Sequence, residues 1–341
     1  MNPKINWGIL GNATIARECV IPAISKSKNG LVHALASQHP KKAEALAEKH
    51  NIAQLYAQYE SVLQDKHVDA VYIPLPNHLH KKWTINALNA GKHVLCEKPL
   101  ACTADEAMEM ADIASKNGLL LMEALMYRFH PRSIYIQQMI RSGKIGAPRL
   151  VRVSFCFHMG EKTLKEKKNI RLKKKMGGGA LLDVGCYGVS VARWLMGEDP
   201  EKVQATAHYN SKGVDIHTAG ILHFRNGGLA TVEASFVSSL QQTYTVVGEA
   251  GAIELPHNAF IPWEKDAEFL YRNRNDEAGQ REIIPGADEY QLMVEHFSEA
   301  VVNGTSPSVP IQDSIQNMRV LDALASSARS GRTVTMPEKK A

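Results

Sequence analysis

The first part of the chain alternates short apolar runs with longer runs that carry apolar residues at helical spacing. This alternation predicts strands and helices in turn, and strands joined through helices form a parallel, doubly wound sheet. We therefore expect an α/β chain whose N-terminal part has a Rossmann architecture. The predicted strands are residues 5–10, 31–37, 68–73, 93–96 and 119–122, and the predicted helices are residues 14–26, 41–50, 77–90 and 103–117.

From about Arg149 the pattern becomes an alternation of apolar and polar residues, with Asn226-Gly227-Gly228 as a hairpin turn. Strands without intervening helices predict a large, mostly antiparallel sheet in a C-terminal α+β domain. We expect a dinucleotide-binding domain at residues 1–124 and a substrate-binding and oligomerisation domain at residues 125–341, whose last helix could pack on the first domain. The predicted strands are residues 150–157, 203–209, 218–224, 230–236 and 242–247, and the predicted helices are residues 185–195, 290–302 and 311–330.

The composition argues against several classes of protein. The chain has 341 residues, 44% of them hydrophobic, which is enough for two buried cores. Its net charge is only +5, and no basic helix with interleaved aromatic residues suggests a nucleic-acid partner. No apolar stretch is long enough to span a membrane and no signal peptide is evident, so we expect a cytoplasmic protein. Five cysteines without a C-x-x-C pair indicate reduced thiols and no metal site.

The turn after the first predicted strand has the pattern G-x-A-x-x-A, formed by Gly11, Ala13 and Ala16. This pattern is a variant of the dinucleotide-binding fingerprint, in which small residues let the backbone approach a pyrophosphate. The helix that begins near Thr14 would supply free N–H groups and a positive dipole. An ordinary strand-to-helix turn is the alternative interpretation.

The end of the second predicted strand offers Ser37, Gln38, Lys41 and Lys42, and no acidic residue follows until Glu44. An NAD-specific enzyme usually places a carboxylate near this position, where it binds the ribose hydroxyls. A hydroxyl, an amide and nearby positive charge instead favour the 2′-phosphate of NADP. A solvated helix start is the alternative for the two lysines.

Two further strand ends carry polar residues. After residues 71–73 the chain turns through Pro74 and Pro76 to Asn77, which we predict as a helix N-cap close to a cofactor. After residues 93–96, Glu97 and Lys98 precede a proline and a helix-opening capping box at residues 103–106. Lys98 is thereby placed at the mouth of the expected crevice.

A glycine run at residues 177–179 precedes Asp183 and Tyr187, which lie four residues apart on one face of a predicted helix. With Lys98 they form the polar set that hydride transfer from an alcohol requires. The phenol takes the hydroxyl proton, the cation lowers the pKa of the phenol, and the carboxylate orients its neighbours. Alternatively, Asp183 caps the helix and Tyr187 belongs to the core.

Taken in order, these stretches resemble the Gfo/Idh/MocA oxidoreductases over nearly the whole chain. The branch containing glucose-fructose oxidoreductase, NADP-dependent D-xylose dehydrogenase and dimeric dihydrodiol dehydrogenase is the most similar. The matching stretches are residues 7–11 (WGILG), 69–73 (DAVYI) with Pro76, Asn77 and His80, 91–99 (GKHVLCEKP), 122–131 (MEALMYRFHP), 169–171 (NIR) and 177–187 (GGGALLDVGCY).

The resemblance implies an active site between the two sheets, with Lys98 as the catalytic lysine, Tyr187 as the proton donor or acceptor and Asp183 as its polar neighbour. It implies NADP(H) as the preferred cofactor with NAD(H) possible, although Gln38 stands where the branch usually has arginine. The residues that the resemblance implies for cofactor binding are Gly11, Ala13, Thr14, Ile15, Ser37, Gln38, Pro74, Leu75, Asn77, His80, Glu97, Lys98, Arg128 and Arg171.

The leading functional hypothesis is hydride transfer between a nicotinamide and a hydroxyl or carbonyl carbon of a sugar or related polyol. A dehydrogenase of a cyclic non-sugar diol and a non-catalytic dinucleotide sensor are the alternatives, and the intact Lys98, Asp183 and Tyr187 argue against the sensor. Residues 161–175 carry eight basic and two acidic side chains. This composition predicts either a solvated loop over the site or a segment that contacts an anionic substrate. The resemblance further implies a homodimer or a dimer of dimers.

Overall fold

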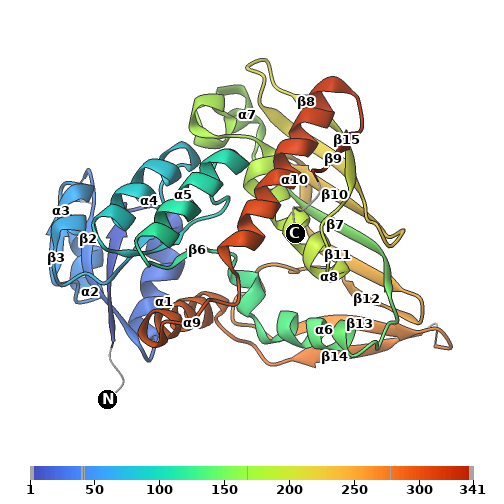
Figure 1. Cartoon of the computed structure of the whole chain (residues 1–341), viewed down its shortest axis with the longest axis horizontal. Coiled ribbons are helices and arrows are strands. Elements are labelled where there is room, and N and C mark those ends of the chain that lie inside the picture. Colours follow the sequence, from blue (N-terminus) through green and yellow to red (C-terminus); the bar gives the residue numbers. More distant parts are fainter. Residues whose placement is uncertain (1–3, 40, 42, 167, 277, 338–341) are drawn as a thin grey trace. The chain divides into compact units, whose positions relative to one another are not determined.

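A computed structural model describes residues 4–39, 41, 43–166, 168–276 and 278–337 (Figure 1). Lys42, which contributed to the coenzyme prediction, lies outside the described residues. The chain divides into two compact units. The first contains the described residues up to Phe129 together with Asp288–Ile315, and the second contains His130–Ala287 together with the described residues from Gln316 onward. The predicted boundary at residue 124 and the predicted packing of the last helix on the first domain stay predictions.

The first unit is built on a parallel sheet that, among the described residues, has six strands in the order β3-β2-β1-β4-β5-β6. The order reverses between β1 and β4, which creates the crevice where doubly wound sheets bind ligands. The predicted Rossmann sheet is confirmed, while β3 was not predicted. The strands are β1 (Ile5–Leu10), β2 (Gly30–Ala36), β3 (Gln54–Tyr56), β4 (Ala70–Ile73), β5 (His93–Cys96) and β6 (Leu121–Glu123).

Helices flank this sheet, and α9, from the later segment, packs against α1. The rings of Trp7 on β1 and Phe297 on α9 lie 5.3 Å apart and both side chains are buried. The prediction of Asn77 as a helix N-cap is wrong, because a 3₁₀ turn begins there and α4 starts three residues later. The helices are α1 (Ile21–Lys26) after a π-helical turn (Ala16–Val20), α2 (Glu44–Lys49), α3 (Tyr59–Gln64), α4 (His80–Asn89), α5 (Ala104–Lys116) and α9 (Glu289–Asn303), with 3₁₀ turns at Asn77–Leu79 and Met126–Phe129.

The second unit contains a sheet with nine described strands in the order β14-β13-β12-β11-β7-β10-β9-β8-β15. The described pairs are antiparallel except β7 with β10, which confirms the predicted large, mostly antiparallel sheet. The strands are β7 (Pro148–His158), β8 (Lys202–Tyr209), β9 (Asp215–His223), β10 (Leu229–Ser235), β11 (Val237–Gly248), β12 (Gly251–Leu255), β13 (Ala267–Asn273), β14 (Gln280–Ile284) and β15 (Val334–Thr335).

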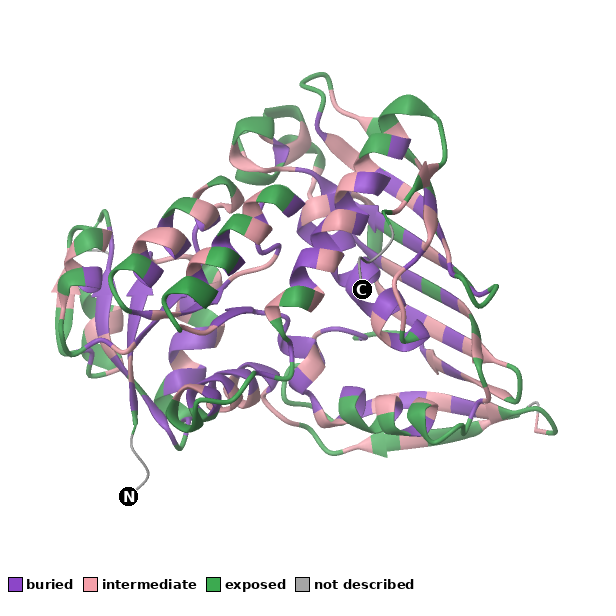
Figure 2. Cartoon of the chain, in the orientation of Figure 1, coloured by how far each residue is buried: buried purple, intermediate pink, exposed green. Residues whose placement is uncertain are grey.

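Helices α8 (Cys186–Met196) and α10 (Ile311–Ser330) pack on this sheet at glycines that allow close approach. A Cβ at Gly188 would lie 2.6 Å from Val232 of β10, and one at Gly220 of β9 would lie 2.7 Å from Leu324 of α10. Buried residues alternate with exposed or half-buried ones along most of β10, and Figure 2 shows the same alternation on the large sheet. The remaining helical elements are α6 (Pro131–Arg141), α7 (Glu161–Glu166), two 3₁₀ turns (Ile170–Leu172, Lys174–Met176) and a π-helical turn (Leu181–Gly185).

No helix in the described part of the chain is both long and apolar enough to cross a membrane.

Candidate functional site

The glycine turn fits the approach of a dinucleotide. Gly11 adopts φ of +120°, which disfavours other residues, and its N–H donates to the Ala36 carbonyl at 2.9 Å. A Cβ at this position would lie only 3.0 Å from Leu75 on the next turn. Two predicted cofactor residues, Gly11 and Leu75, are therefore neighbours. Ala13 is half-buried and Thr14 is exposed, so the start of the following helix is accessible.

The end of β2 presents a buried hydroxyl. Ser37 is 4% exposed, its backbone N–H donates to the Tyr56 carbonyl at 2.9 Å, and its Oγ accepts from the His39 N–H at 3.2 Å. Gln38 and His39 are exposed. The backbone here is held by β3, which the sequence did not predict.

Lys98 follows β5 on a turn that Glu97 organises. The Tyr72 hydroxyl donates to Glu97 Oε1 at 2.6 Å, and the Lys98 backbone N–H donates to Glu97 Oε2 at 3.2 Å. Burial and the neighbouring Glu97 carboxylate raise the pKa of Tyr72 well above its usual value. The Lys98–Pro99 peptide is cis, a conformation that a proline at this position permits.

A second buried carboxylate holds the far side of the same turn. Glu123 at the end of β6 is fully buried, and its Oε1 accepts from the Leu100 N–H at 2.9 Å. Burial raises the pKa of Glu123 to about 7. Beyond this turn the predicted capping box is present, since Thr103 accepts from the Glu106 N–H at 3.3 Å.

His80 joins two of these turns from inside the first unit. Its side chain is fully buried, with Nε2 2.7 Å from the Leu75 carbonyl and Nδ1 2.9 Å from the Pro99 carbonyl. Burial lowers the pKa of His80. Both ring nitrogens thus face protein carbonyls, which links the Leu75 turn to the Lys98 turn. Arg128, a further predicted cofactor residue, instead faces Asp313 across 3.5 Å and is largely buried.

The second unit holds the tyrosine and the aspartate together. Tyr187 on α8 is 5% exposed, and its ring lies 5.3 Å from those of Phe155 and Phe260, which stack on one another. Asp183, one turn earlier, accepts from Arg171 Nε at 2.7 Å. The Asp183 carboxylate raises the pKa of Arg171, to which Tyr187 also contributes. The predicted neighbours Asp183 and Tyr187 therefore share a cluster with Arg171.

Asp215 positions this cluster and was not predicted. Its Oδ2 accepts from the Leu181 N–H at 2.7 Å and from the Thr218 hydroxyl at 3.0 Å, at the start of the helix that carries Asp183. Asp183 is therefore inside the helix rather than its cap. Burial raises the pKa of Asp215. Its only sequence signal is an isolated acid at the start of a β-strand, which gives no indication of its partner.

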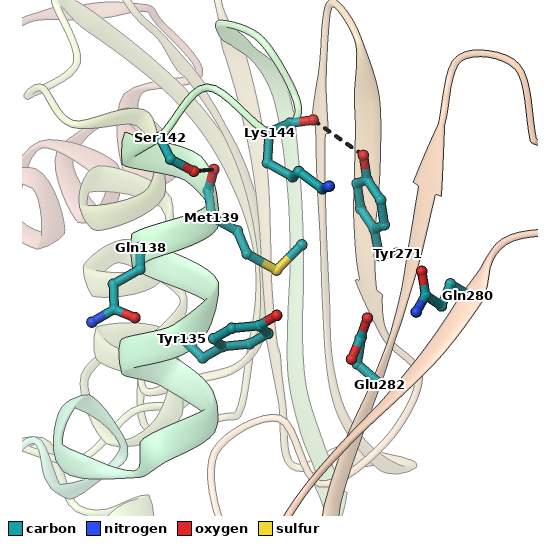
Figure 3. A pocket seen from close by; sticks show the side chains of 8 residues that line it. All are labelled: Tyr135, Gln138, Met139, Ser142, Lys144, Tyr271, Gln280 and Glu282. Carbon is teal, nitrogen blue, oxygen red and sulfur yellow. Dashed lines mark hydrogen bonds between the residues drawn. The ribbon is translucent and has the colours of Figure 1, made fainter.

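A cavity of about 460 Å³ also opens in the second unit, between α6 and strands β13 and β14 (Figure 3). Figure 3 shows Tyr135 of α6 and Tyr271 of β13 on opposite sides of it, and the Tyr271 hydroxyl donates to the Lys144 carbonyl at 3.2 Å. The cavity contains none of the predicted site residues. Its lining residues are Tyr135, Gln138, Met139, Ser142, Lys144, Tyr271, Gln280 and Glu282.

A Rossmann sheet with a glycine turn, followed by a domain with a buried tyrosine near an aspartate in the chain, is the arrangement expected of a dinucleotide-dependent oxidoreductase. Residues 5–125 match the oxidoreductase family with an NAD-binding Rossmann fold, and residues 134–254 match the GFO/IDH/MocA C-terminal domain. The chain belongs to the Gfo/Idh/MocA family and is an NAD(P)-dependent dehydrogenase or reductase.

Similarity to individual proteins extends over most of the chain. D-xylose 1-dehydrogenase (NADP(+)) 2 of Haloferax volcanii is 38% identical over 97% of this chain and 99% of its own length. Trans-1,2-dihydrobenzene-1,2-diol dehydrogenase of Xenopus tropicalis is 31% identical over 75% of this chain and 76% of its own. The solved structure of a 3-ketoreductase from Actinomadura kijaniata in complex with NADP and TDP-benzene is similar to this chain with a TM-score of 0.87 and a sequence identity of 29%. The match covers 95% of this chain and 98% of the 3-ketoreductase chain.

Proposed function

We propose that the protein transfers a hydride between NADP(H) and a hydroxyl or carbonyl carbon of a sugar or related polyol. The observation that carries this proposal is the Tyr187 cluster, because a buried phenol beside a carboxylate and a guanidinium suits proton transfer to and from a substrate oxygen. The 38% identity with a D-xylose dehydrogenase supports a sugar as the substrate.

In the oxidative direction, Tyr187 would accept the hydroxyl proton of the substrate, and the bound coenzyme would accept the hydride at C4 of its nicotinamide. Lys98 would favour the ionised phenol through its positive charge. Asp183 would fix Arg171, so that the guanidinium stays beside Tyr187. Glu97 and Glu123 would hold the backbone on either side of Lys98 without taking part in the chemistry.

The coenzyme would be NADP(H) in preference to NAD(H). Ser37 at the end of β2 offers a hydroxyl where a carboxylate would repel the 2′-phosphate. The similar D-xylose dehydrogenase is an NADP(+) enzyme, and the similar 3-ketoreductase was solved with NADP. Because Gln38 lacks a guanidinium, we expect the preference to be modest unless another residue supplies a cation.

An anionic, nucleotide-linked sugar is the second candidate substrate. Residues 161–175 are rich in lysine, and within the described chain Lys173, Lys174 and Lys175 have no carboxylate partner. The similar 3-ketoreductase was solved with TDP-benzene, a nucleotide-linked compound. A cyclic diol is a third candidate, on the strength of the dihydrodiol dehydrogenase relative.

Turnover assays with purified enzyme test these candidates directly. D-xylose, D-glucose, a dTDP-linked sugar and a trans-dihydrodiol would each be offered with NADP+ and with NAD+, and reduced coenzyme would be followed at 340 nm. The proposal expects the highest kcat/KM with a free sugar and NADP+. A dTDP-sugar that exceeds every free sugar would establish the second candidate, and binding of coenzyme without turnover of any substrate would indicate a sensor.

We further propose a cytoplasmic homodimer or a dimer of dimers. Helices α8 and α10 cover one face of the large sheet, while Ile221 and Leu229 on neighbouring strands are 41% and 40% exposed. A second copy of the sheet would cover such residues. All five cysteines are unbridged, which suits a reducing compartment. A monomer observed by light scattering at micromolar protein concentration would contradict this proposed assembly.

A further inference from the structure

Arg17 is a cation that packs against the glycine turn. Its Nη1 donates to the Asn12 carbonyl at 2.8 Å, and its Nη2 donates to the Thr14 hydroxyl at 3.2 Å. These two bonds use two of the five N–H donors of the guanidinium, which leaves three for a ligand. Within the described residues, Arg17 forms no ion pair with a carboxylate. Its charge is therefore held in place by neutral acceptors and is not compensated.

The anchor of Arg17 lies next to the junction of the turn with β2. Asn12 directly follows Gly11, whose N–H donates to the Ala36 carbonyl at 2.9 Å, and Ala36 directly precedes Ser37. The Asn12 carbonyl, which accepts from the Arg17 guanidinium, thus belongs to the residue next to Gly11, and the Gly11 N–H forms the hydrogen bond that joins the turn to the end of β2. In Rossmann domains the adenosine ribose binds at this end of the second strand.

This strand end needs a cation if it is to bind a 2′-phosphate. Ser37 supplies a buried hydroxyl and Gln38 an exposed amide, but neither carries charge. Arginine binds phosphate through paired N–H donors, and such charge-assisted bonds are about twice as strong as neutral ones. We propose that Arg17 binds the 2′-phosphate of NADP(H) and supplies the cation that Gln38 lacks. This inference rests on the proposed use of NADP(H).

The test is equilibrium binding to the enzyme in the absence of substrate. Isothermal titration calorimetry with NADP+ and NAD+ would compare the native enzyme with Arg17→Gln, Arg17→Lys and Lys41→Gln, which removes the competing cation for the 2′-phosphate. Lys41 is another, exposed cation near the end of β2. Arg17→Gln should raise the Kd for NADP+ by about tenfold or more, equivalent to about 1.4 kcal/mol, and the Kd for NAD+ by less than about threefold. Arg17→Lys should restore part of the NADP+ affinity, and Lys41→Gln should change it by less than about threefold.

Each other outcome has a distinct meaning. Equal losses of both coenzymes would place Arg17 at the pyrophosphate and overturn the inference. An unchanged Kd for NADP+ in a folded Arg17→Gln variant would also overturn it, as would an effect confined to Lys41→Gln. Titrations with 2′,5′-ADP and 5′-AMP isolate the adenosine half and should show the same selective loss. A native enzyme that prefers NAD+ would instead refute the proposed coenzyme, independently of the Arg17 variants.

Discussion

Arg171 donates from Nε to Asp183 Oδ2 across 2.7 Å, and this ion pair lies one helical turn before Tyr187. The backbone maintains it, because the Gly179 N–H donates to the Arg171 carbonyl at 2.9 Å and a Cβ at Gly178 would collide with that carbonyl. The glycine run thus brings the loop against the helix. The family resemblance assigns Arg171 to the cofactor, whereas its observed contact is with the predicted catalytic aspartate.

Asp183→Asn tests this relationship, because it keeps the shape of the side chain and removes the charge that fixes Arg171. We expect kcat/KM to fall by about 10- to 100-fold with a smaller change in coenzyme affinity. Asp199→Asn is the matched control, since Asp199 pairs with Arg193 of α8 at 2.7 Å and lies beyond the Tyr187 cluster. Equal losses in the two variants would show that the Arg171 pair is only structural.

The proposed proton transfer is tested by Tyr187→Phe and Lys98→Ala. Each should lower kcat by about 100-fold or more, because one removes the proton acceptor and the other the cation that favours its ionised form. Tyr187→Phe retains the ring contacts with Phe155 and Phe260, so its Tm should stay close to that of the native enzyme. Tyr271→Phe, which loses a hydroxyl elsewhere in the same unit, is the control. Near-normal turnover in either test variant would refute its assigned role.

Coenzyme choice is tested at Ser37, whose Oγ accepts from the His39 N–H. Ser37→Asp retains an acceptor for this bond and adds a negative charge beside the expected 2′-phosphate. We expect kcat/KM with NADP+ to fall about tenfold or more and the ratio to shift towards NAD+. Ser37→Asn is the uncharged control and should shift the ratio less. A native preference for NAD+ of tenfold or more, about 1.4 kcal/mol, would contradict the interpretation of this strand end.

The apolar pattern predicted most of the strands and helices. Most helices and the strands of the large sheet bury one face, which leaves a repeating apolar pattern, whereas strands of the parallel sheet such as β4 are buried throughout and form continuous apolar runs. It missed β3, which has three residues, and the edge strand β14, which carries a polar run, QRE. It also missed β13, although every second residue from Ala267 to Tyr271 of this strand is buried, as in a strand with one face in the core. The buried residues are Ala267, Phe269 and Tyr271. Periodicity identifies an apolar face but not what covers it, so the contact of Trp7 with Phe297 could not be predicted.

The site residues likewise divide into those that the sequence predicted and those that it did not. Asp183 and Tyr187 were predicted because helical spacing places them on one face. Arg17 and Asp215 were missed because their roles depend on contacts with a backbone carbonyl and a helix start that no local pattern encodes. The motif around Lys98 was recognised, but the buried carboxylate that holds its far side comes from another strand.

That carboxylate, Glu123, gives a prediction for stability against pH. Burial raises the pKa of Glu123 in the folded protein to about 7, from 4.5 for an unburied glutamate. Between these values the folded protein binds a proton that the unfolded chain has released. The free energy of unfolding therefore decreases as pH rises from about 4.5 to about 7 and becomes independent of this group above that range. The difference corresponds to about 3 kcal/mol of lost stability.

Glu123→Gln removes this ionisation while leaving an oxygen that can accept the 2.9 Å bond from the Leu100 N–H. Relative to the native enzyme, the variant should gain stability as pH rises, so that the difference in Tm is more favourable to the variant at pH 8 than at pH 5. Thermal unfolding at half-unit steps of pH measures this difference. Parallel profiles for Glu123→Gln and the native enzyme would show that Glu123 does not titrate in this range when folded.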